Sequence, residues 1–233
     1  PVAAALVVSA NHLIQAGRAG PVISRTIAGR KVLIDPGHGG IDPGVVSGDL
    51  QEKDFTLAIS LQLKKLFMEA GVPVLLTRET DTDLCYSQEA AEAGRRKKLD
   101  LRTRVSVTES SGADVYLGIH VNGSNSSQWN GPQTFYCSQA NALSGRLAVL
   151  IQEEMARLSP TQRQAIDTTG QYMLKTLKVP AVTVEVGFLS NAKDTAQLVQ
   201  PEHQRKLAWA IFTGTVRFFA EEPKAPGAGP PDP

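Results

Sequence analysis

The chain has 233 residues, of which 42% are hydrophobic and 20% are charged. This composition is typical of a globular domain and excludes a chain that is disordered throughout. The formal net charge of +1 argues against a protein that neutralises many phosphates, so nucleic acid is not an expected partner. The short basic run at 95–98 is compatible with a local basic groove, although a solvated loop or helix face is the simpler interpretation.

The two ends of the chain lack the pattern of folded elements. Residues 1–29 include a short apolar stretch, and we interpret them as a leader or as the remnant of a signal peptide or anchor. That stretch is much shorter than the roughly 20 residues needed to span a bilayer. Residues 222–233 are rich in proline and glycine, which indicates a flexible tail or linker. The folded domain is therefore expected at 30–221.

Strand-like runs and helical patterns alternate between these ends. The continuously apolar strands and their alternation with helices predict a single α/β domain. Its sheet is expected to be mixed but mostly parallel, with helices on both faces. The expected strands are 31–35, 72–77, 114–121, 133–137 and 179–186, and the expected helices are 53–70, 99–111, 141–158 and 203–219.

The chain contains two cysteines, Cys85 and Cys137. Two are too few for a disulfide framework or a zinc ribbon, and their spacing does not decide whether they form a single disulfide. Cys137 lies in an apolar run, which favours a small core residue.

Four residues suited to metal or acid–base chemistry lie where predicted strands end or a helix begins. His38 follows the first strand in a Pro-Gly-His-Gly-Gly loop, and His120 and Glu185 close two later strands. Glu52 directly precedes the helix at 53–70. The carboxyl ends of parallel strands meet at one edge of a sheet, where sites form in open α/β folds. We therefore expect these four side chains to meet there.

The residue types match a zinc hydrolase. Two imidazoles and one carboxylate make a three-ligand zinc site with one position open for water, and a second carboxylate can move protons beside it. Each residue also has a structural alternative. His120 is compatible with a core histidine, and Glu52 with an acid that favours the helix dipole. Glu185 stands in an apolar strand, where a carboxylate is costly unless it is paired or binds something.

Five sequence blocks resemble the zinc-dependent N-acetylmuramoyl-L-alanine amidases of the Amidase_3 family. The family hydrolyses the amide between N-acetylmuramic acid and the L-alanine of the stem peptide in peptidoglycan. The resemblance implies that His38, Glu52 and His120 bind one Zn²⁺ and that Glu185 is catalytic. It also aligns Arg104 and Asn122 with family residues, for which we expect substrate binding. The blocks are VLIDPGHGG at 32–40, EKD at 52–54, TRETD at 77–81, IHVN at 119–122 and VEVGFLSN at 184–191.

A narrower resemblance is to the germination-specific amidases of spore-forming bacteria. It is carried by residues 86–105, by Ser-Gln-Trp at 127–129 and by Tyr-Met-Leu at 172–174. It implies action on the spore cortex, as a step toward muramic-δ-lactam, in the envelope space between mother cell and forespore. No wall-binding module is visible, so an activator or anchoring protein, or an N-terminal membrane anchor, is expected to target the enzyme. One departure is Gly118, where many members carry serine, which leaves one fewer hydroxyl near the site.

Other functions share parts of this pattern. A vegetative cell-wall amidase or autolysin has the same residues. A zinc carboxypeptidase or endopeptidase that acts on peptidoglycan peptides binds its metal through the same types of residue. An Fe(II) oxygenase also uses two histidines and a carboxylate, but it leaves Glu185 unexplained. A non-enzymatic wall-binding module would need none of the four residues together.

Overall fold

The computed structural model describes residues 27–85, 93–159 and 161–222. Residues 1–26 of the leader expected at 1–29 and residues 223–233 of the tail expected at 222–233 lie outside these residues, so the domain boundaries stay a prediction. Ile27 of the expected leader is described and is fully buried in the larger core. The elements are β1 (Val32–Pro36), β2 (Val46–Ser47), β3 (Leu50–Gln51), α2 (Glu52–Glu69), β4 (Val74–Leu76), α3 (Ala93–Ser110), β5 (Val115–Asn122), β6 (Gln133–Tyr136), α4 (Ser144–Leu158), β7 (Ile166–Asp167), α5 (Tyr172–Thr176), β8 (Ala181–Phe188), α6 (Ala192–Leu198) and α7 (Pro201–Glu221).

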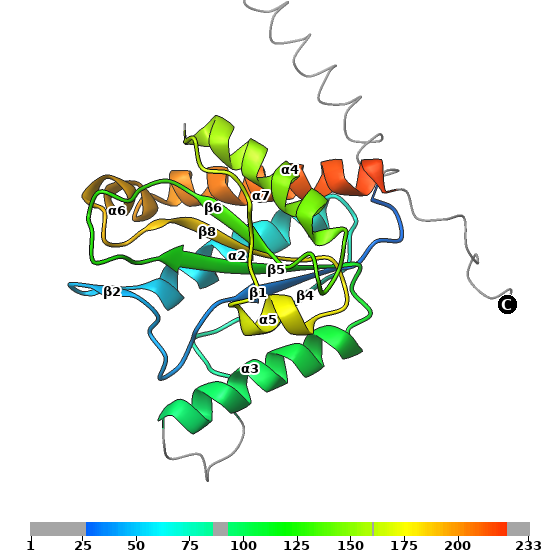
Figure 1. The fold of residues 1–233 in the computed structure, drawn as a ribbon, viewed down its shortest axis with the longest axis horizontal. Helices are drawn as coiled ribbons and strands as arrows, with labels where there is room; N and C mark the ends of the chain where they lie inside the picture. The colour runs from blue at the N-terminus through cyan, green and yellow to red at the C-terminus, as the bar shows by residue number, and fades with distance from the viewer. Residues whose placement is uncertain (1–26, 86–92, 160, 223–233) are drawn as a thin grey trace, which may run out of the picture.

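The centre of the molecule is a six-stranded sheet in the order β4-β1-β5-β8-β6-β7 (Figure 1). Strands β4, β1, β5 and β8 are parallel to one another, β6 is antiparallel to β8, and β7 is parallel to β6. Strands β2 and β3 form a separate two-stranded hairpin. The expected α/β fold with a mostly parallel mixed sheet is confirmed.

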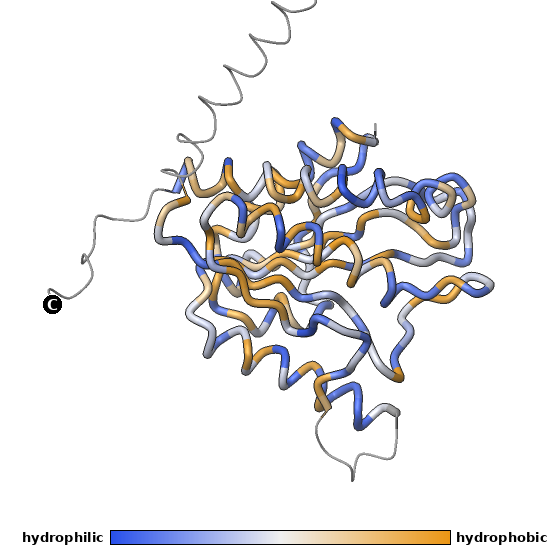
Figure 2. The backbone as a smooth tube through the Cα atoms, turned by 180° about the vertical axis from the view of Figure 1, so that it is seen from behind, coloured by the Kyte–Doolittle hydropathy of each residue, from blue (hydrophilic) through white to orange (hydrophobic). Residues whose placement is uncertain are grey.

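Helices cover both faces of the sheet, as expected. The larger core lies on the face covered by α2, α4 and α7, and a smaller cluster packs under α3 and α5. Hydrophobic residues run along the central strands, which are buried from both sides (Figure 2). Cys137 is 2% exposed in the smaller cluster, which confirms its predicted core role. None of the described helices is long and apolar enough to cross a membrane.

The largest error in the predicted elements concerns α3. The helix was expected at 99–111 but begins at Ala93, so the basic run at 95–98 is helical rather than part of a loop. The first turns carry four cations and little apolar surface, and they therefore lack the periodic pattern by which amphipathic helices are recognised. The hairpin β2–β3, strand β7 and helices α5 and α6 were not predicted because each is seven residues or shorter.

The tight contact between α7 and α4 depends on a glycine. A Cβ atom on Gly214 would lie 2.6 Å from the Cα of Ile151, which is backbone and has no free rotamer to move away. Ile151 is fully buried in the larger core. The two helices therefore approach more closely than any other residue at this position would allow.

We expect Gly214→Ala to lower the free energy of unfolding by about 1–3 kcal/mol, the usual cost of overpacking a well-packed core. Urea unfolding followed by circular dichroism measures the change. Gly94→Ala is the matched control, because a Cβ there meets nothing within 4 Å and alanine favours helix by up to about 1 kcal/mol. Equal effects of the two substitutions would contradict the close packing at Gly214.

Candidate metal centre

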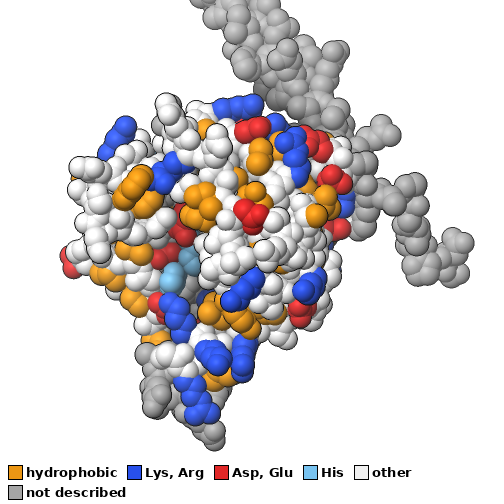
Figure 3. Space-filling model, viewed as in Figure 1, with side chains coloured by type: hydrophobic (Ala, Val, Ile, Leu, Met, Phe, Trp, Pro, Cys, Tyr) orange, Lys and Arg blue, Asp and Glu red, His pale blue; other side chains and the backbone are white. Residues whose placement is uncertain are grey.

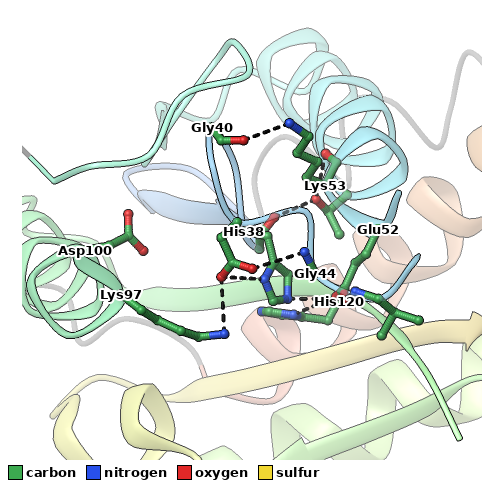
Figure 4. A network of polar contacts seen from close by, with 12 residues as sticks. His38, Gly40, Gly44, Glu52, Lys53, Lys97, Asp100 and His120 are labelled. Atoms are coloured by element: carbon green, nitrogen blue, oxygen red, sulfur yellow. Dashed lines mark hydrogen bonds and ion pairs between the residues drawn. The ribbon is translucent and has the colours of Figure 1, made fainter. Parts of the chain in front are cut away.

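Three of the four predicted residues form a compact group at the carboxyl edge of the sheet. His38 follows β1, Glu52 is the first residue of α2, and His120 lies near the end of β5. Their candidate ligand atoms all lie within 4.8 Å of one another. The two imidazole rings meet edge to face, with centroids 5.1 Å apart. Figure 4 shows the three side chains converging from these separate elements.

Glu52 is the centre of this group. Its Oε2 atom lies 3.2 Å from His38 Nε2, and its Oε1 atom lies 3.0 Å from His120 Nδ1. Each oxygen also accepts a backbone N–H bond of 2.9 Å, from Val45 and Val121 respectively. Burial disfavours the charged carboxylate, but the hydrogen bonds and charges of the two histidines hold its pKa far below the usual range. The geometry therefore presents one nitrogen of each histidine and an ionised carboxylate to a common point.

The loop that carries His38 has a demanding backbone. His38 itself has a φ of 61°, a left-handed conformation that non-glycine residues adopt rarely. A Cβ on Gly37 would lie 2.3 Å from His120 Cε1, and a Cβ on Gly44 would lie 2.5 Å from Glu52 Oε2. Glycine at these two positions is what allows the loop to close against the other two members of the group.

Two buried arginines hold this loop by its carbonyl groups. Arg78, from the Thr-Arg-Glu-Thr-Asp block, donates to the carbonyls of Pro36 and Gly37 at 3.1 and 2.9 Å. Arg104 of α3 donates to the carbonyls of Pro36 and His38 at 2.9 and 2.7 Å. The three successive carbonyls thus have charged donors, which stabilises a loop conformation that is strained at His38.

Asp42 is a member of the site that the sequence reasoning missed. Its Oδ2 atom lies 2.9 Å from His38 Nδ1, the ring nitrogen that faces away from Glu52. Burial disfavours the charged ring, but the hydrogen bonds to Asp42 and Glu52 raise the pKa of His38 to about 9. A carboxylate on the outer nitrogen of a metal-binding histidine fixes its tautomer and orientation. The spacing of four residues from His38 within a glycine-rich loop was the available signal.

Glu185 lies on the neighbouring strand beside the group. It is paired with His120 in the register of β5 and β8, so the two side chains project from the same face of the sheet. Its Oε2 atom is buried and has no hydrogen-bond partner in the described structure. Burial raises the pKa of Glu185 to about 7. The charge of His120 lowers this pKa, and the negative charge of Glu52 raises it further. A carboxyl with such a pKa can both accept and donate a proton near neutral pH.

The group opens into a pocket of about 240 Å³ between α3 and α5. Figure 3 shows the pale-blue histidines and nearby acidic side chains at the bottom of this hollow. The lining residues are Asp35, Gly37, His38, Asp42, Lys97, Asp100, Leu101, Arg104, Tyr116, His120, Gln171, Tyr172, Met173, Thr183 and Glu185.

Arg104 sits beneath this pocket in a buried polar network. Besides the two carbonyls, it donates to Asp35 Oδ1 at 2.5 Å and to Asp100 at 2.7 and 3.4 Å. These bonds use all five guanidinium donors, and the residue is 2% exposed. Asp35 also accepts from Tyr116 at 2.5 Å and from Thr77. The network joins β1, β5 and α3 directly below the loop of His38.

Gly118 makes room for part of this network. A Cβ there would lie 3.0 Å from the Tyr116 hydroxyl and 3.1 Å from its ring. The family serine expected at this position would therefore crowd Tyr116, whose hydroxyl supplies a bond to Asp35. In this chain the Tyr116 hydroxyl therefore lies in the space that a serine side chain at position 118 would need.

Asn122 does not line the pocket. Its side-chain oxygen accepts a 2.9 Å bond from the backbone of Gly123, and its backbone carbonyl accepts one from Leu189. The bond from Leu189 ties the end of β5 to the end of β8, whereas the bond from Gly123 is local. The substrate-binding role expected for Asn122 stays a prediction.

The fold and the site define a hydrolase of the α/β class with a candidate metal-binding triad. Comparison with known proteins agrees. The sequence matches the Amidase_3 family of N-acetylmuramoyl-L-alanine amidases over residues 32–217. It is 39% identical to the germination-specific N-acetylmuramoyl-L-alanine amidase of Bacillus subtilis over 204 residues, covering 87% of this chain and 85% of that protein.

Two further relatives extend the comparison. The amidase LytC of Bacillus subtilis is 34% identical over 198 residues, which are 84% of this chain but 37% of that protein. Among solved structures, the CwlD amidase of Clostridioides difficile, in complex with the GerS lipoprotein, matches with a TM-score of 0.79 and 35% identity. That match covers 82% of this chain and 99% of CwlD.

The chain therefore belongs to the N-acetylmuramoyl-L-alanine amidase family, as its sequence blocks predicted. It is a hydrolase that cleaves peptidoglycan at the amide bond between N-acetylmuramic acid and L-alanine.

We expect Asp35→Asn to lower the free energy of unfolding at pH 7 by about 1–3 kcal/mol, because it removes one of the two carboxylates that pair with the buried Arg104 and leaves only Asp100. Although burial opposes its ionisation, the charge of Arg104 and the bonds from Thr77 and Tyr116 lower the pKa of Asp35 below its ordinary 3.8. The stabilisation is therefore complete above about pH 4 and is lost as the pH falls through the lower, folded-state pKa.

Urea unfolding at several pH values between 2 and 7 should show the difference between wild type and Asp35→Asn shrinking at the acid end. Asp49→Asn is the control, because Asp49 is exposed in the turn between β2 and β3. A difference that does not change with pH would contradict the ionised Asp35.

Proposed function

We propose that His38, Glu52 and His120 bind one Zn²⁺ and that Glu185 acts beside it as the catalytic acid and base. The observation that carries this proposal is the shared, buried carboxylate of Glu52, which faces one nitrogen of each histidine. Two imidazoles and a carboxylate are a common ligand set of catalytic zinc, which leaves a fourth position for water. When bound, zinc would supply a water that ionises near neutral pH and would polarise the scissile carbonyl.

The protein residues account for the rest of the reaction. Glu185 accepts a proton from the attacking water and returns it to the leaving nitrogen of L-alanine, which a carboxyl with a pKa of about 7 can do in both directions. Its Oε2 atom has no protein partner among the described residues and is available to the reacting groups. Asp42 holds the outer nitrogen of His38 and so keeps the inner nitrogen directed at the site.

The resemblance suggested a substrate-binding role for Arg104, and the geometry favours a different one. We assign Arg104 to positioning the loop of His38, because its donors all reach internal acceptors. Asn122 is proposed to support the junction of β5 and β8 through its backbone bond to Leu189, and substrate binding by its side chain stays a prediction.

The relatives suggest a setting for this activity. A germination-specific amidase shares 39% identity over most of both chains, which supports a role in the spore cortex and in germination. The match to LytC keeps a vegetative wall amidase as the alternative. Both relatives support a location outside the cytoplasm, in the cell envelope, and we propose the space between mother cell and forespore as the sporulation setting. The CwlD structure was solved with a lipoprotein, which supports a lipoprotein as activating or anchoring partner here.

We expect the purified protein to release stem peptides that begin with L-alanine from peptidoglycan, and a chelator to abolish this release. Mass spectrometry of the products from cortex and vegetative sacculi, digested side by side, measures both the bond and the preference. The cortex role predicts faster digestion of cortex, and a preference for vegetative sacculi would favour the autolysin. Release of free D-alanine would indicate a zinc carboxypeptidase instead.

We expect Glu185→Gln to retain zinc but to lower kcat by about a hundredfold or more, because the amide cannot transfer the proton. His38→Ala should lose both zinc and activity. Zinc content after gel filtration and hydrolysis of a soluble muramoyl peptide measure the two properties separately. Loss of zinc in Glu185→Gln equal to that in His38→Ala would show that Glu185 is a ligand and would refute its assigned role.

A further inference from the structure

The catalytic pocket contains one cationic side chain that is available to a ligand. Apart from the histidines, its lining includes two cations, Arg104 and Lys97. The donors of Arg104 are all used internally, as described above. The side chain of Lys97 is 55% exposed and extends from α3 toward the loop of His38 (Figure 4).

The ion pair between Lys97 and Asp42 can be broken at little cost in free energy. Its ammonium group lies 3.2 Å from Asp42 Oδ2, and ion pairs as exposed as this one contribute little to stability. Asp42 does not depend on it, because Asp42 also contacts His38 Nδ1 at 2.9 Å and accepts a 3.1 Å bond from the Gly44 backbone. Lys97 can therefore turn to a new anion while Asp42 keeps its place beside His38.

Lys97 stands between the catalytic pocket and a second pocket. The second pocket has a volume of about 340 Å³ and shares Lys97, Asp42 and Asp100 with the first. A chain that continues from the reacting bond into the second pocket passes along these three shared residues, and Lys97 is the only cation among them. The remaining lining residues of the second pocket are Ile41, Pro43, Asp83, Gly94 and Arg96.

The exposed part of α3 beside Lys97 is positively charged although the whole chain is almost neutral. The carboxylates of Asp42 and Asp100 line both pockets with Lys97, and Asp42 is paired with His38 and Asp100 with Arg104. Arg95, Lys98 and Arg102 are exposed on the same helix, and no carboxylate in the described ranges lies within ion-pair distance of them. Figure 3 shows Lys and Arg side chains gathered over α3, directly below the histidines. Such a concentration of one charge beside a pocket attracts a ligand of opposite charge. Arg96 is not part of it, because it forms two bonds to Asp83.

We propose that Lys97 is a specificity-determining residue that binds a carboxylate of the stem peptide as the peptide runs from the catalytic pocket into the second pocket. The inference rests on the proposed amidase function and deepens it, because it identifies the preferred substrate as an acidic peptide. A lysine suits this task as a mobile point charge that can follow carboxylates at more than one position. The alternative is a purely structural Lys97 that only braces Asp42 and, through it, His38.

The test uses two soluble muramoyl peptides of equal length, one with free side-chain and terminal carboxylates and one with these groups amidated. We expect the wild-type zinc enzyme to prefer the acidic substrate by about threefold to fivefold in kcat/KM, mainly through KM, as the loss of one partly exposed ion pair implies. Lys97→Met should lose this preference by raising KM for the acidic substrate alone. Lys97→Glu should reverse it.

Lys98→Met is the matched control. It removes the same charge one residue along the helix, from a side chain that lines neither pocket, and it should keep the preference. Zinc content, measured for every variant, should not change with Lys97→Met.

Two results would overturn the inference. Equal kcat/KM of the wild type for both substrates would show that the carboxylates are not recognised. An equal loss on both substrates in Lys97→Met, with or without loss of zinc, would show a bracing role. Failure of the wild type to cleave either substrate would refute the proposed amidase function itself, and this separates the two failures.

Discussion

The Glu52 side chain is almost completely buried and its carboxyl is ionised, with one histidine at each oxygen. A buried carboxylate is costly unless its charge and its lone pairs are satisfied. Here two backbone N–H groups and two imidazoles satisfy it. Val45 and His38 come from the loop between β1 and β2, Val121 and His120 come from β5, and Glu52 itself begins α2. The need to satisfy this one group therefore joins three separate parts of the chain at a single point. A metal ion bound there would take the place of the contacts between the Glu52 carboxylate and the two histidines.

The polar network of Asp35, Arg104 and Tyr116 supports this arrangement from below. The network is buried, and separating its charged groups would cost free energy because each would lose its partner away from water. This cost keeps the side chains in their relative positions. Through Arg104 the network reaches the carbonyl of His38, and with Arg78 it stabilises a backbone conformation that is unfavourable by itself. The candidate ligand His38 is thus carried by a strained loop, and the buried guanidinium groups of Arg78 and Arg104 stabilise that loop. Glycines at 37 and 44 provide the space in which the loop meets its partners.

The two sides of the pocket differ in character. Toward the sheet lie the candidate ligands and Glu185, whose burial adapts its carboxyl for proton transfer. Toward α3 lies the exposed Lys97, which stands at the passage to the second pocket. Under the proposed roles, bond cleavage depends on residues of strands and loop ends, whereas substrate preference depends on an exposed side chain of a surface helix. Substitutions on that helix face would then alter specificity without disturbing the groups that act on the bond.

The sequence by itself determined the α/β fold, the positions of most long helices and strands, the family and the meeting of His38, Glu52 and His120. Apolar runs and strand ends are local features, and the parallel sheet brings strand ends to one edge by a general rule. Only the tertiary structure decided the earlier start of α3, because its first turns carry charge rather than apolar periodicity. It alone identified Asp42 behind His38, and it showed that the donors of Arg104 are all used in the buried network, whereas Lys97 is exposed and has a single ion pair with Asp42. Those distinctions depend on hydrogen bonds and ion pairs between residues that are far apart in the sequence. A local sequence pattern cannot show which of these residues come into contact.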